Sequence, residues 1–83
     1  MSPRPYPTIS GRELIQRLEQ AYGYRKIRQR GSHIRIRTMR KGKHSLTIPD
    51  HKELDVGTLN GIINAVARHF GVDKQDVIAK LFK

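Results

Sequence analysis

One histidine of the sequence stands inside an alternating run of arginines. From His33 to Arg37 polar and apolar side chains alternate, which is typical of a half-buried β-strand. The alternation puts His33 on the same face as Arg35 and Arg37 and the isoleucines on the opposite face. An exposed imidazole beside cations that attract phosphate can act as a general base or acid on a phosphodiester. RNA supplies its own nucleophile, the 2′-hydroxyl, so one such group suffices for cleavage without a metal ion.

The chain is strongly basic, and the charge is concentrated around this histidine. Its 83 residues include 17 Lys and Arg against 7 Asp and Glu, which gives a formal net charge of +10. No acidic residue lies in the segment 24–49, which holds nine of the basic ones: Arg25, Lys26, Arg28, Arg30, Arg35, Arg37, Arg40, Lys41 and Lys43. Solubility is served by mixed charges, so a field of one sign indicates a polyanionic partner such as a nucleic acid.

Other chemistries find less support in the sequence. The absence of cysteine excludes disulfides, thiolate metal sites and cysteine nucleophiles. His44, His51 and His69 show no metal-ligand spacing, and the segment 24–49 has no carboxylates for two-metal catalysis. We therefore expect no metal and no cofactor. No apolar run approaches the roughly 20 residues of a membrane span, and no signal-peptide pattern follows the start, so we expect a cytoplasmic protein without a membrane partner.

The patterns around the basic segment predict one small α+β domain over residues 10–83, preceded by a flexible arm over the proline-rich residues 1–9. A first helix is expected from Ser10, which can form a capping box with Glu13, to Gly23. Three strands are expected at 24–29, 33–39 and 45–49, with a turn at 40–43. Two more helices are expected, from about Gly57 to Gly71 and after a cap at Asp73.

The resulting order, α-β-β-β-α-α, predicts a three-stranded antiparallel sheet. We expect the helices to cover one face of this sheet and the other face to be left to solvent. The isoleucines of the alternating strand then face the helices. His33 and its neighbouring arginines lie on the open face.

Four blocks of the sequence carry a resemblance to a known family: Ser10–Ile15, Arg28–His33, Thr47–Leu54 and Gly57–Leu59. In this order and spacing they resemble the HicA toxins, the mRNA interferases of bacterial and archaeal toxin–antitoxin modules. The resemblance covers residues 10–82. It implies a fold similar to double-stranded RNA-binding domains, cleavage of mRNA, and a HicB-type antitoxin that masks the active site. It also implies that His33 is the catalytic residue.

Together these features favour a toxin that acts as a metal-independent endoribonuclease. His33 is expected to move a proton at the 2′-hydroxyl or at the leaving oxygen, while Gly31 and Ser32 shape the turn that meets the RNA. The residues expected to hold phosphates are Arg30, Arg35, Arg37 and Lys41. A non-catalytic RNA-binding module of the same fold, with His33 as one contact, remains the alternative. A DNA-binding regulator is less favoured because neither later helix presents a basic recognition face.

Overall fold

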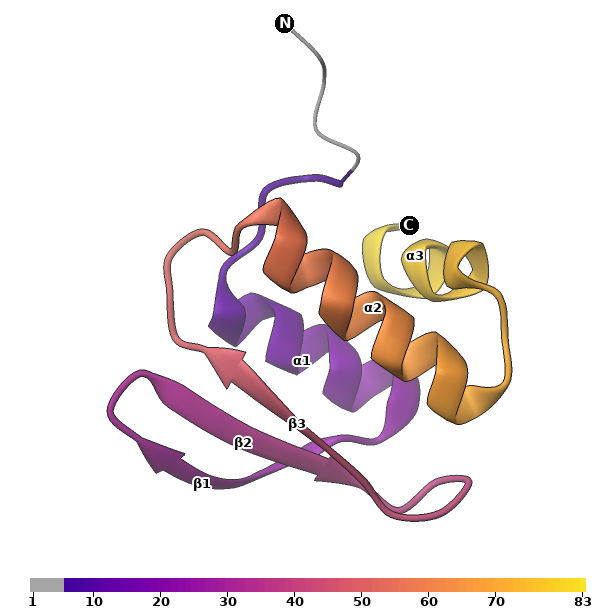
Figure 1. Cartoon of the computed structure of the whole chain (residues 1–83), viewed down its shortest axis with the longest axis horizontal. Helices are drawn as coiled ribbons and strands as arrows, with labels where there is room; N and C mark the ends of the chain where they lie inside the picture. Colours follow the sequence, from indigo (N-terminus) through magenta and orange to yellow (C-terminus); the bar gives the residue numbers. More distant parts are fainter. Residues whose placement is uncertain (1–5) are drawn as a thin grey trace, which may run out of the picture.

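A computed structural model, which describes residues 6–83, contains one three-stranded antiparallel sheet and three helices (Figure 1). In chain order the elements are α1 (Gly11–Tyr22), β1 (Arg25–Arg30), β2 (His33–Thr38), β3 (His44–Pro49), α2 (Val56–Phe70) and α3 (Lys74–Phe82). The strands are ordered β1-β2-β3, so β2 is central. The predicted α+β class and the predicted order of elements are confirmed.

The helices lie on one side of the sheet, and the core is the layer between them (Figure 1). The sheet contributes Ile34, Ile36 and Ile48, all buried. The helices contribute apolar side chains at helical spacing, among them Leu14, Leu18, Leu59, Ile63, Val66, Val77 and Leu81. No helix of residues 6–83 covers the opposite face of the sheet, which leaves the polar side chains of β2 on the open side.

The start of α1 follows the predicted cap only in part. The Ser10 hydroxyl accepts a hydrogen bond from the Glu13 amide at 3.0 Å, as an N-cap should. The Glu13 carboxylate does not reach back to complete a capping box, because it pairs with Arg17 one turn further on, at 3.2 Å. The helix ends at Gly23, whose φ of 74° is a left-handed conformation that glycine adopts without strain.

The two later helices begin differently. Asp55 caps α2, because its carboxylate accepts a hydrogen bond from the Thr58 amide at 2.6 Å. Asp73 occupies the corresponding position before α3, but its side chain makes no capping hydrogen bond, so this predicted cap is wrong. Only the backbone position of Asp73 matches the expectation.

Part of the predicted arm packs on the domain. Residues 1–5 lie outside the described residues, whereas Tyr6 and Ile9 are buried. The Tyr6 hydroxyl donates to Asn60 Oδ1 at 2.5 Å, and the carbonyl of Ile9 accepts from the Leu54 amide at 2.9 Å. Pro7 and Thr8, between Tyr6 and Ile9, are exposed, so the segment anchors to the domain at its two ends.

Candidate nucleic-acid interface

The open face of β2 carries the residues that the alternation placed there. Ile34 and Ile36 are buried, His33 is exposed, and Arg35 and Arg37 are half-buried. On the neighbouring strand β1, arginines stand opposite these three residues. The register pairs Arg30 with His33, Arg28 with Arg35, and Arg25 with Arg37. We call this set of six residues the cationic sheet face: Arg25, Arg28, Arg30, His33, Arg35 and Arg37.

A β-bulge in β1 makes this arrangement possible. Arg25 and Arg28 are an odd number of residues apart, so in a regular strand they would point to opposite faces. The pairing shifts between Lys26 and Arg28, and the unpaired Ile27 is 42% exposed. The extra residue returns Arg28 to the face of Arg25. Arg25 and Arg28 were not among the expected site residues, because their only signal in the sequence was their membership of the basic segment 24–49.

Hydroxyl groups from β3 fix the two arginines of β2. The Arg35 guanidinium donates to Thr47 Oγ1 at 3.0 Å, and Arg37 Nε donates to Ser45 Oγ at 3.1 Å. A guanidinium has five N–H donors, so both arginines keep donors for a further acceptor. Arginines held in this way are prepared for phosphate, because less side-chain freedom is lost on binding.

His33 lies in a shallow depression of this face. The depression has a volume of about 200 Å³ and is lined by Arg28, Arg30, His33, Arg35 and Thr47. Among residues 6–83 the His33 imidazole makes no hydrogen bond and no ion pair. Both of its ring nitrogens are therefore available to a bound molecule, and one of them can accept or donate a proton.

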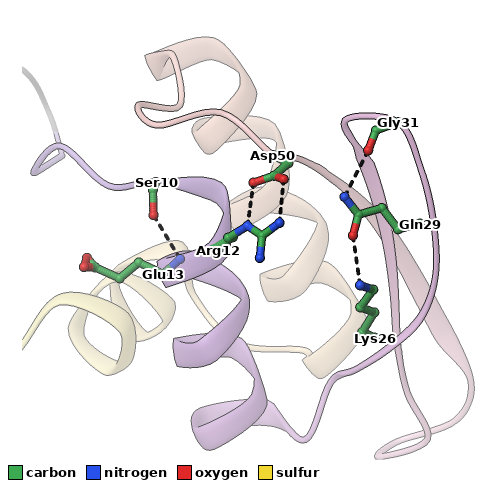
Figure 2. A network of polar contacts seen from close by, with 7 residues as sticks. All are labelled: Ser10, Arg12, Glu13, Lys26, Gln29, Gly31 and Asp50. Carbon is green, nitrogen blue, oxygen red and sulfur yellow. Dashed lines mark hydrogen bonds and ion pairs between the residues drawn. The ribbon is translucent and has the colours of Figure 1, made fainter.

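The backbone of the turn before His33 is well anchored. Gly31 has a φ of 55°, and its carbonyl accepts from Gln29 Nε2 at 3.0 Å. The carbonyl of Ser32 accepts from the Asp50 amide at 2.6 Å. Arg12 holds the Asp50 carboxylate through two hydrogen bonds of 2.9 Å each (Figure 2). The hydrogen bonds from Arg12 lower the pKa of the Asp50 carboxyl below its ordinary value.

Lys41 is not brought together with the other predicted site residues. It lies in the hairpin turn between β2 and β3, with a φ of 59°, at the end of β2 remote from His33. The first and last residues of β2, six residues in all, are roughly 17 Å apart, and Lys41 lies beyond the last one. Lys41 is therefore too far from His33 to contact a group bound beside that imidazole.

His44 and His69 are far apart in the sequence but lie together at the end of β2 that is remote from His33. The rings of His44 and His69 stack with centroids 4.4 Å apart and planes 11° apart. His44 Nδ1 is 2.8 Å from the Tyr24 hydroxyl, and His69 Nε2 is 2.9 Å from the carbonyl of Arg40. Burial, and to a smaller extent His69, lower the pKa of His44. This pair ties the hairpin to the end of α2.

Within residues 6–83, no three His, Asp or Glu side chains gather where they could hold a metal ion. The same part of the chain has no helix with the length and apolar character needed to cross a membrane.

The element order defines the class of fold: a small α+β domain with the α-β-β-β-α order of double-stranded RNA-binding domains, followed by a third helix. A family model described as HicA toxin of bacterial toxin-antitoxin matches residues 11–71, from the first residue of α1 to the glycine after α2. The chain belongs to the HicA toxin family, and the resemblance seen in the sequence is confirmed. Comparison with curated proteins and with solved structures gave no match.

Proposed function

We propose that this toxin is a metal-independent endoribonuclease that cleaves mRNA, with His33 as its catalytic residue. One observation carries the proposal: an exposed imidazole without polar partners among residues 6–83 lies in a depression lined by three arginines. Cations there attract the substrate, and the imidazole is left for proton transfer.

The arginines are spaced to follow a single RNA strand. Successive residues on one face of a strand are about 6.7 Å apart, and neighbouring strands are about 4.8 Å apart. The cationic sheet face therefore offers two parallel rows of guanidinium groups on β1 and β2, which can contact consecutive phosphates. Phosphate contacts of this kind position a strand and do not read its bases. We expect single-stranded or loosely structured RNA to bind here.

The reaction follows from the position of His33 beside such a phosphate. The 2′-hydroxyl oxygen attacks the adjacent phosphorus, forming a new P–O bond, and the bond to the 5′-oxygen of the next nucleotide breaks. His33 takes the proton from the 2′-hydroxyl or gives one to the leaving oxygen, and water completes the other transfer. Arg28 and Arg35 stabilise the charge that develops on the phosphoryl oxygens. The products are a 2′,3′-cyclic phosphate and a 5′-hydroxyl.

The protein partner follows from the same charge. The family places the chain in a toxin–antitoxin system, and the net charge of +10 favours an acidic inhibitor. We propose a HicB-type antitoxin that covers His33 and the cationic sheet face, because that position blocks the substrate most directly. Hydrogen exchange on the complex should show protection over β1 and β2. Protection confined to the helices, with His33 still accessible, contradicts the proposal.

A second candidate function is a non-catalytic RNA-binding module. The observation that favours it is that no side chain among residues 6–83 forms a hydrogen bond with the His33 ring, whereas catalytic histidines are commonly oriented by a third group. In this alternative His33 is one more phosphate contact, and RNA bound to the protein stays intact.

Product analysis tests the proposed function. Purified protein is incubated with 5′-labelled single-stranded RNA in the presence of EDTA, and the fragment ends are identified. We expect 5′ fragments that end in a cyclic phosphate or its hydrolysis product, with the same yield with and without chelator. Intact RNA supports the binding module instead, and loss of cleavage in EDTA contradicts the metal-independent reaction.

A further inference from the structure

Gly11, the first residue of α1, packs against the end of β3, the strand that pairs with β2. A Cβ atom on Gly11 would lie 1.9 Å from the carbonyl oxygen of Pro49, so only glycine permits this approach. The Gly11 amide also donates to the carbonyl of His51 at 2.9 Å. Pro49 is the cross-strand partner of His33. The start of α1 therefore fixes the end of β3 that lies beside His33.

Arg12, the next residue, extends this contact to the turn itself. Its guanidinium holds both oxygens of the Asp50 carboxylate at 2.9 Å, and the Asp50 amide in turn holds the carbonyl of Ser32 at 2.6 Å. Ser32 immediately precedes His33. Two links thus run from α1 to the residue before His33: Arg12 binds Asp50, and Asp50 binds Ser32.

Gln29 secures the turn from the other strand. Its amide nitrogen donates to the carbonyl of Gly31 at 3.0 Å, and its amide oxygen accepts from Lys26 Nζ at 2.8 Å (Figure 2). The two carbonyls before His33, those of Gly31 and Ser32, are therefore held by separate donors. We call the supporting residues the turn brace: Gly11, Arg12, Gln29 and Asp50.

We infer that the turn brace positions His33 for proton transfer, with Arg12 and Asp50 as positioning residues that touch no substrate; this inference rests on the proposed function. The ring of His33 has no polar partner of its own among residues 6–83, so its backbone sets where it lies. A proton-transfer group displaced by about 1 Å can lose on the order of 100-fold in rate. The Arg12–Asp50 pair is mostly exposed on the Arg12 side, at 72%, so its part in overall stability is small.

A matched pair of variants tests this inference. Asp50→Asn breaks the ion pair with Arg12 and keeps the backbone amide that bonds Ser32. Glu13→Gln also removes one negative charge beside α1, but it breaks only the pair with Arg17, on the side away from the turn. Both variants change the net charge equally, so they raise nonspecific attraction for RNA by the same amount.

The readouts are the cleavage rate of bound, labelled single-stranded RNA and the RNA affinity, measured for both variants and the wild type. We expect Asp50→Asn to lower the bound-state rate by 10- to about 100-fold with little change in KM, and Glu13→Gln to leave the rate unchanged. Arg12→Gln should match Asp50→Asn. The double variant should be no worse than either single one, because both break one interaction.

The NMR resonances of the His33 ring and of the amides of residues 31–33 add a measurement of position. They should shift in Asp50→Asn and stay in place in Glu13→Gln. A wild-type bound-state rate in Asp50→Asn and Arg12→Gln, or an equal loss in Glu13→Gln, overturns the inference while the proposed function stands. A wild-type protein that binds RNA without cleaving it overturns the proposed function and the inference with it.

Discussion

Two histidines occupy opposite ends of the same small sheet and differ in almost every physical respect. His33 stands opposite Pro49 where β2 begins, and His44 stands opposite Thr38 where β2 ends. His33 is exposed, lies among arginines, and makes no polar contact within residues 6–83. His44 is half-buried, stacks on His69 and bonds to Tyr24. From residue type alone, the two histidines are equal candidates for a catalytic role.

The difference shows how burial and partners divide the possible roles of an imidazole. Burial lowers the pKa of His44 and favours its neutral form, and its partners use its ring to join β3 to α2. Such a ring contributes to the fold and has little freedom to exchange protons with a substrate. The ring of His33 forms no hydrogen bond within residues 6–83, while the backbone before it is held by the turn brace. We therefore expect replacement of His33 to affect activity and replacement of His44 to affect stability.

The largest difference should be seen in growth. Expression of the wild-type chain without its antitoxin should arrest growth, and His33→Ala should abolish the arrest, because a positioned proton-transfer group contributes roughly 10²–10⁴-fold to a rate. His44→Gln, expressed to the same level of folded protein, should still arrest growth. Protein abundance is checked by immunoblot. Growth arrest by His33→Ala would contradict the catalytic role of His33.

A smaller effect should be seen in the salt dependence of RNA binding. With about five cations engaged, log affinity should fall against log salt with a slope near −3.5, which is a loss of roughly 100-fold between 50 and 200 mM. Arg35→Ala and Arg37→Ala should each reduce the slope by about 0.7, whereas His44→Gln should leave it unchanged. Filter binding over a salt series provides the measurement. A slope near zero would contradict an electrostatic role of the cationic sheet face in RNA binding.

The smallest effect should appear in stability at mildly acidic pH. The folded-state pKa of His44 lies below the unfolded value of about 6.5, so the unfolded chain takes up protons first as the pH falls. The stability linked to His44 is therefore present above pH 6.5 and is lost as the pH falls below it. Thermal unfolding midpoints from pH 7.5 to 5.5 should decline in the wild type and decline less in His44→Gln. Equal declines in the two proteins contradict this assignment.

The residues that sequence patterns placed correctly are those governed by local periodicity. Alternation from His33 to Arg37 was enough to assign both faces of β2, because side chains of a strand alternate whatever lies beyond it. The end of α1 was visible because Gly23 takes a conformation that other residues avoid. These signals lie within a few residues of the feature that they predict.

What escaped prediction depends on contacts between distant segments. The bulge at Ile27 is defined by the register against β2, which the sequence of β1 alone does not specify. Tyr6 bonds to Asn60 and stacks on Phe82, and His44 stacks on His69; each of these partners lies in a helix far along the chain. The need for glycine at position 11 becomes visible only when Pro49 is placed beside it.

The central claim, that His33 transfers a proton and is not merely a phosphate contact, is tested most directly by the cleavage rate of RNA already bound to His33→Gln. Glutamine keeps a polar side chain that can donate to phosphate, but it cannot serve as a general base or acid at neutral pH. At saturating protein we predict RNA affinity close to that of the wild type and a bound-state cleavage rate lower by at least about 100-fold. A wild-type rate in His33→Gln, or a loss of affinity that accounts for the whole loss of cleavage, would contradict the account.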